Sequence, residues 1–212
     1  MSDFPKDIYT EPEDPDVDTL ANLGPLAGMA GVWQGTRGLD TSPKADGPEK
    51  QAFIERIELQ PIDPQMNGPQ LLYGLLYHTH ITKPNEVETF HSQVGYWLWE
   101  PATGMIVHTL TIPRGLVTMA VGHAKPNAKS FEVSAKRGAS DFGICSTPFL
   151  EHAFRTDEFR MKVKINDDDT WSYEETTVLK VRGKAEPFPH TDRNTLKRIA
   201  KATPNPLART SR

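Results

Sequence analysis

"LAGMAGVWQGTRG", residues 26–38, places four glycines around two large residues, Val32 and Trp33. Glycine destabilises a helix at every interior position, so this stretch is not predicted to be helical. Gly31, Trp33 and Gly35 alternate along the chain, which is typical of a β-strand that bends sharply or closely approaches another backbone. A barrel needs such a strand where its sheet bends at closure.

On both sides of this strand, short alternating segments are separated by residues that favour turns. EPATGM, IPRG, KPNAKS and NDDDT have the Gly, Pro, Asn and Asp content of hairpin links. One amphipathic helix is predicted within residues 18–29, where it could plug one end of the fold, and residues 138–151 are predicted to be a loop or a frayed strand. The predicted strands are residues 31–39, 52–60, 71–81, 88–99, 105–111, 116–124, 130–136, 152–166, 170–182 and 195–201.

Consecutive strands joined by hairpins predict an all-β fold, a closed antiparallel up-and-down barrel of about ten strands with a short N-terminal helix. A barrel of this size is wider than one that side chains can just fill, so an internal cavity is expected. The barrel domain is assigned to residues 20–201. Residues 1–19 are predicted to be an acidic, proline-rich flexible arm, and residues 202–212 a flexible tail.

Composition narrows the choice of partners and compartment. A formal net charge of −4 argues against nucleic acid, because phosphate contacts need clustered Lys and Arg. No window approaches the ~18 apolar residues of a membrane helix, so no membrane partner is expected. The single cysteine, Cys145, and the lack of a signal-peptide pattern favour a cytoplasmic protein. The sequence is compatible with a homodimer.

Three stretches resemble the nitrobindin family of heme-binding β-barrels, which are similar in shape to fatty-acid-binding proteins. GVWQG at 31–35 resembles the G-x-W-x-G start of the family, and HSQVGYW at 91–97 resembles its H-x-E-x-G-Y segment. RGLVTMAVG at 114–122 resembles its T-G-L-V-E-V-x-x-G strand. Arg37 stands where the family usually has another glycine, and Gln93 replaces the family's glutamate.

The resemblance implies heme b as cofactor and His190 as its axial ligand. In the family this histidine precedes the last strand in a segment similar to P-x-x-P-H, and EPFPHTDRNTLKRI at 186–199 places His190 there, about one residue out of register. Pro187 and Pro189 stiffen the approach to His190. The other interpretation is that His190 and Asp192 form a turn network that holds the last strand.

His91 matches the family's histidine on the opposite side of the pocket. Trp97 shares its predicted face because alternate strand residues point the same way. The third motif implies that Leu116 and Met119 line the cavity. No catalytic side chain is predicted, and no metal ligand other than the heme ligand His190. His108, His123 and His152 are expected to be surface or packing residues. The predicted ligand pocket consists of His91, Trp33, Thr36, Trp97, Leu116 and Met119.

The resemblance implies that a ferric heme on His190 binds nitric oxide or isomerises peroxynitrite to nitrate. A heme-free barrel that carries or senses a small hydrophobic ligand is one alternative. A cupin-like metal-dependent enzyme is another, because His78 and His80 share one face of a predicted strand. Two groups of residues loosely resemble the two cupin motifs, although neither spacing is right: Gly74, His78, His80 and Glu86, and Pro113, Gly115, His123 and Asn127.

Overall fold

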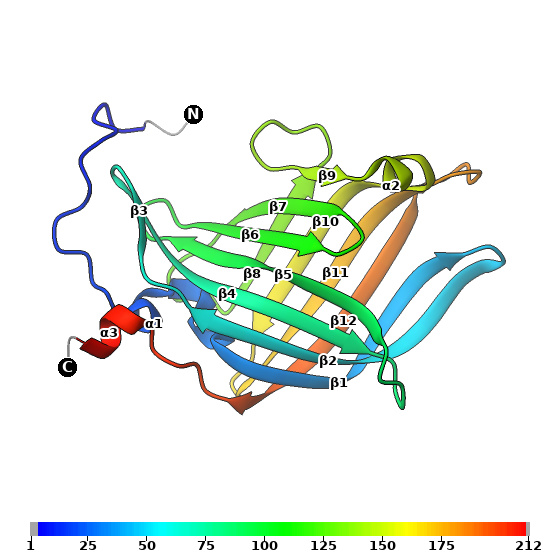
Figure 1. Ribbon diagram of the computed structural model, residues 1–212, viewed down its shortest axis with the longest axis horizontal. Helices are drawn as coiled ribbons and strands as arrows, with labels where there is room; N and C mark the ends of the chain where they lie inside the picture. Colours follow the sequence, from blue (N-terminus) through cyan, green and yellow to red (C-terminus); the bar gives the residue numbers. More distant parts are fainter. Residues whose placement is uncertain (1–3, 211–212) are drawn as a thin grey trace.

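The computed structural model describes residues 4–210 and shows a barrel (Figure 1). Twelve strands form one antiparallel sheet. Eleven of them follow the spatial order β2-β1-β12-β11-β10-β8-β7-β6-β5-β4-β3, and β9 pairs with β7. Because β2 also pairs with β4, the sheet is a closed ring. Two short strands, β3 and β9, are additions to the closed ring. The ring itself is therefore the predicted ten-stranded antiparallel barrel.

The elements follow the predicted hairpin order. The helices are α1 (Thr19–Asn22), the 3-10 helix η1 (Gly24–Met29), α2 (Pro148–Ala153) and α3 (Pro206–Thr210). The strands are β1 (Gly31–Lys44), β2 (Gly47–Pro61), β3 (Gln65–Asn67), β4 (Gln70–Thr82), β5 (Thr89–Glu100), β6 (Met105–Ile112), β7 (Leu116–His123), β8 (Ser130–Lys136), β9 (Ile144–Ser146), β10 (Phe154–Ile165), β11 (Thr170–Val181) and β12 (Phe188–Ala200).

The largest difference from the predicted boundaries is the start of the last strand. β12 begins at Phe188 instead of residue 195, so His190 lies inside the strand and not in a turn before it. From Phe188 to His190 the strand pairs only with β11, because its pairing with β1 starts at Thr191. Pro189 is tolerated there because a proline at an edge position removes no ladder hydrogen bond from a second neighbour.

The stretch predicted as a loop or frayed strand contains β9 and the short helix α2. Pro148 occupies the first turn of α2, where the missing N–H of a proline has no helical partner to lose. Because this helix runs to Ala153, β10 begins at Phe154, two residues later than the prediction of a strand from residue 152.

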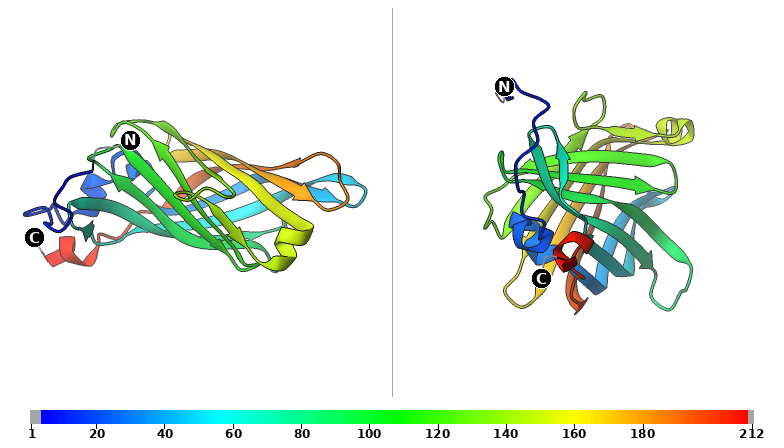
Figure 2. Two further views of the ribbon diagram at one scale, coloured as in Figure 1. Left: turned by 90° about the horizontal axis from the view of Figure 1, so that it is seen from above. Right: turned by 60° about the vertical axis from the view of Figure 1, so that its left-hand side comes forward.

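The predicted N-terminal helix is divided into α1 and η1. Gly24, the first residue of η1, adopts a positive φ of 53°, and Pro25 follows it. Leu23, Leu26 and Met29 are fully buried and belong to the core. The two short helices therefore plug one end of the barrel, beside α3 (Figure 2). None of the helices in residues 4–210 is long and apolar enough to cross a membrane.

The glycines of the opening motif lie where β1 is irregular. The pairing of β1 with β12 breaks between Gln34 and Leu39, and its pairing with β2 breaks between Gly35 and Gly38. A Cβ on Gly35 would lie 2.3 Å from Nδ2 of Asn194, which is too close for any real contact. Gly35 therefore leaves the space into which an inward side chain of the last strand fits.

We predict that Gly35→Ala destabilises the barrel by about 1–3 kcal/mol, because the added methyl group must displace the buried Asn194 side chain. Urea unfolding of the variant and the wild type measures the change. Gln34→Ala, at the exposed neighbouring position of β1, is the control and should change the stability by less than about 0.5 kcal/mol. Equal stability of Gly35→Ala and wild type would contradict this account of the motif.

Candidate functional site

The barrel encloses a cavity of about 390 Å³, within the size range of small-molecule sites. Its outer end, here called the mouth, is bordered by partly exposed side chains, including His91, Arg114 and His190. Leu150 of α2 also contributes to the lining, so this short helix lies over the mouth. The mouth is at the opposite end of the barrel from the plug.

The inner end of the cavity lies toward the plug and is largely aromatic. Trp97, His108, Phe159 and Trp171 line it, and each is at most 4% exposed. The His108 ring stacks on Trp97 with 3.9 Å between centroids and 6° between planes. Burial lowers the pKa of His108 to about 3, so its imidazole is neutral at physiological pH.

At the mouth, His190 of β12 is hydrogen-bonded to Asp40 of β1, with Nε2 2.6 Å from Oδ1. Burial alone would lower the pKa of His190, but the hydrogen bond and the charge of Asp40 outweigh burial and raise it. The partner of His190 is thus Asp40 across the β1–β12 pair, and not Asp192 as in the turn-network interpretation. Pairing of the first and last strands creates this contact.

Asp40 also begins a row of inward carboxyl groups. It lies opposite Asp192 of β12, which in turn lies opposite Glu175 of β11. Burial and neighbouring charges raise the pKa of Glu175 to about 8 and that of Asp192 well above its ordinary value. Protonation of Glu175 at neutral pH allows the three groups to lie side by side. One signal for this row is visible in the sequence, because Glu175 alternates with the buried Trp171 and Tyr173.

A fourth carboxyl group, that of the buried Glu55 of β2, lies deeper in the barrel. Its Oε2 accepts hydrogen bonds from Tyr173 Oη at 2.9 Å and from Asn194 Nδ2 at 3.0 Å. Burial raises the pKa of Glu55 to about 7, although both hydrogen bonds act in the opposite direction. The Asn194 side chain that packs against Gly35 thus also stabilises this carboxyl group.

Hydrogen bonds join the mouth to the inner end. His91 Nε2 lies 3.1 Å from Gln93 Oε1, and Gln93 Nε2 donates to Tyr77 Oη at 3.1 Å. Tyr77 Oη lies 2.9 Å from Nε2 of His108. His108, expected from the sequence to be a surface or packing residue, is therefore a packing residue that also faces the cavity.

Four of the predicted site residues line this cavity: His190, His91, Trp97 and Leu116. Trp33 is buried but is not among the lining residues. Its Nε1 donates to Met29 O at 2.7 Å, and its ring meets Trp171 edge-on. Trp33 therefore joins the plug to the core.

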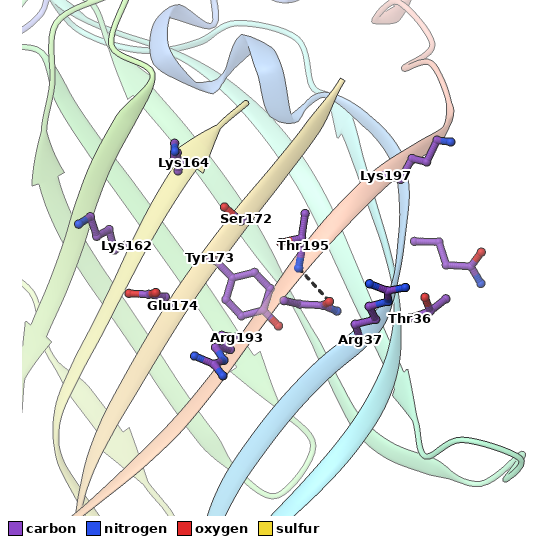
Figure 3. A pocket seen from close by; sticks show the side chains of 12 residues that line it. Thr36, Arg37, Lys162, Lys164, Ser172, Tyr173, Glu174, Arg193, Thr195 and Lys197 are labelled. Atoms are coloured by element: carbon purple, nitrogen blue, oxygen red, sulfur yellow. Dashed lines mark hydrogen bonds between the residues drawn. The ribbon is translucent and has the colours of Figure 1, made fainter. Parts of the chain in front are cut away.

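Thr36 and Met119 also lie away from the cavity. Thr36 follows Gly35 in the irregular part of β1 and borders an outer pocket with Arg37, Lys162 and other polar residues (Figure 3). Met119 is 39% exposed on the outer face of β7. It is three residues from Leu116, so the two cannot share a strand face, and Thr118 lines the cavity instead.

We predict that Glu55→Gln reduces the pH dependence of stability. Folded Glu55 has a pKa of about 7 against 4.5 when unperturbed, so the folded state binds more protons between these values and loses stability as pH rises. From pH 5 to pH 8 this loss is on the order of 2–3 kcal/mol. Gln retains an acceptor for Tyr173 and Asn194.

Urea unfolding at pH 5 and pH 8 tests this prediction. Glu55→Gln should lose less stability than wild type over this interval, whereas the control Glu58→Gln, on the outer face of β2, should behave as wild type does. The same pH dependence in Glu55→Gln and wild type would show that Glu55 does not titrate as a buried acid.

Comparison with known proteins identifies the family. No match is found among curated proteins. Among solved structures, Rv2717c from M. tuberculosis matches with a TM-score of 0.59 and 21% sequence identity, over 85% of this chain and 96% of that one, which supports the fold alone. The model of a family described as the THAP4-like, heme-binding beta-barrel domain matches residues 22–198. The chain therefore belongs to the THAP4-like family of heme-binding β-barrel domains.

Proposed function

We propose that this protein binds heme b at the mouth of its cavity, with His190 as the axial ligand of the iron. The observation that carries the proposal is the His190–Asp40 pair, at 2.6 Å, in the cavity of a heme-binding family member. Metal-binding histidines usually hydrogen-bond a carboxylate or carbonyl through the other ring nitrogen. Within residues 4–210, Nδ1 of His190 has no hydrogen-bond partner, so it is available to a metal.

The rest of the cavity also fits a porphyrin. Phe90, Ile112 and Leu179 supply apolar surface toward the mouth. Lys44 and Arg114, both exposed and both lining the cavity, provide cations for the anionic propionate groups of heme. The raised pKa values of Glu175 and Asp192 limit the negative charge in the part of the cavity below the mouth.

Each residue has a distinct role in this proposal. His190 binds the iron, and Asp40 holds the proton on Nε2 and fixes the orientation of the ring. Heme, when bound, supplies an iron site that takes nitric oxide or converts peroxynitrite to nitrate, and the resemblance to nitrobindins supports this chemistry. His91 faces the same cavity from β5 and would tune the binding of the exogenous ligand.

There are two alternative functions. A heme-free carrier or sensor of a small hydrophobic ligand is compatible with the apolar lining of the cavity. The cupin-like enzyme gains no support. His78 and His80 lie on the outer face of β4 and bond to Ser92 and Thr89. Across residues 4–210, no group of three or more His, Cys, Asp or Glu is arranged to hold a metal ion.

We predict a histidine-ligated ferric heme spectrum from protein expressed with a heme supply. His190→Ala should abolish this spectrum because the iron loses its only protein ligand. His91→Ala should retain bound heme and change mainly the rate of nitric oxide binding, measured by stopped-flow absorbance. Wild-type protein without heme, or His190→Ala with an unchanged spectrum, would refute the assignment.

Asp40→Asn tests the positioning role of Asp40. The neutral amide is a weaker acceptor for His190, so heme affinity should fall about tenfold or more, and the iron–histidine stretching frequency should fall in resonance Raman spectra. Asp46→Asn, in the exposed turn between β1 and β2, is the matched control and should change neither quantity. Unchanged frequency and affinity in Asp40→Asn would mean that Asp40 only stabilises the fold.

A further inference from the structure

The cavity contains hydrogen-bonding groups that the protein itself does not pair. In residues 4–210, four buried side-chain atoms have no hydrogen-bond partner: Asp40 Oδ2, His108 Nδ1, Thr118 Oγ1 and Trp171 Nε1. All four residues line the same cavity. Because an unpaired buried polar group costs about 1–3 kcal/mol, such groups are rare, and their gathering around one cavity indicates a ligand that pairs with them.

The hydrogen-bond chain from the mouth fixes which proton His108 carries. The amide oxygen of Gln93 can only accept, so His91 donates to it, and the Gln93 amide nitrogen donates to Tyr77. Burial raises the pKa of Tyr77 well above its ordinary value, so Tyr77 keeps its proton and donates it to Nε2 of His108. Neutral His108 must then carry its own proton on Nδ1, which is a donor without an acceptor.

Thr118 provides a second donor beside His108. His108 of β6 lies opposite Ala120 of β7, so Thr118 is its diagonal neighbour on the inward face. Such neighbours are roughly 7–8 Å apart between Cα atoms, so one oxygen atom placed between the two side chains can accept from both. Each residue is 1% exposed, which makes this a site reached only from within the cavity.

We propose that the inner end of the cavity binds an uncharged molecule with a flat aromatic body and a carbonyl oxygen, which accepts hydrogen bonds from His108 Nδ1 and Thr118 Oγ1. Trp97 and Phe159, both close to the His108 ring, form the aromatic walls. The ligand is uncharged because the cavity already holds four carboxyl groups, those of Asp40, Glu55, Glu175 and Asp192, and its Lys and Arg side chains are at the mouth. This site lies at the inner end of the same cavity whose mouth holds His190 and Asp40.

A pair of matched compounds measures the contribution of the carbonyl oxygen to binding. Acetophenone and α-methylstyrene have nearly the same shape, and only the former carries an acceptor oxygen. Calorimetric titration of the full chain, purified without added heme, should show about five- to tenfold tighter binding of acetophenone, the effect of one net hydrogen bond. Benzoate, the charged analogue, should bind more weakly than acetophenone.

Variants of His108 and Thr118 test whether these two donors cause the preference for acetophenone over α-methylstyrene. Thr118→Val and His108→Phe, the latter retaining an aromatic ring against Trp97, should each lower the preference for acetophenone to roughly twofold or less. Thr111→Val, the same substitution on the exposed outer face of β6, should leave it unchanged. In nitrogen NMR spectra, the His108 Nδ1 signal should be that of a protonated nitrogen and should shift on addition of acetophenone but not of α-methylstyrene.

Four results would overturn the proposal: no binding of either compound, equal binding of both, tighter binding of benzoate, or a preference that persists in both donor variants. None of them depends on heme, so failure here leaves the assignment of His190 intact. Conversely, protein that prefers acetophenone but takes up no heme would support this site alone.

Discussion

The structure depends on the pairing of the first strand with the last. β1 and β12 meet where the chain must close its sheet, and Gly35 permits this by leaving space for Asn194. The same pair of strands, further toward the mouth, places His190 against Asp40. One strand pairing therefore closes the barrel and assembles the candidate axial ligand with the carboxylate that orients it.

Closing ten strands also leaves an interior too wide for side chains to fill. Aromatic residues and the N-terminal plug fill one end, and the remaining space is bordered by polar groups that the barrel cannot fully pair. Burial raises the pKa of Glu55 and Glu175 and lowers that of His108, so near neutral pH Glu175 and His108 are largely uncharged and Glu55 is about half protonated. The lining of the cavity therefore carries little charge and offers hydrogen-bonding groups at fixed positions. Such a lining suits a ligand that makes one or two polar contacts.

Alternation along the chain was sufficient to predict the barrel, its strand order and a shared face for His91 and Trp97, whereas the pocket positions of His91 and Leu116 were predicted from the family resemblance. It failed where the pattern is broken. Thr36 lies in the irregular part of β1, where period two no longer holds, and the prolines before His190 concealed the first residues of β12. Met119 was placed by analogy to a motif against the parity of its own strand.

The polar interior was harder to predict, because pairs such as His190 with Asp40 and Tyr173 with Glu55 join residues more than a hundred positions apart. A partial signal existed for His108, which shares a face with Ile106 and Leu110 and so had to point into the core. That signal shows burial, but only the structure shows that Tyr77 engages one ring nitrogen and leaves the other toward the cavity.

A crystal structure of the heme-reconstituted protein would show which residue binds the iron. We predict iron bonded to the His190 imidazole, with Asp40 on the other ring nitrogen and the porphyrin edge toward Arg114. Heme bound without a bond to His190, or seated in the outer pocket beside Thr36, would contradict this prediction.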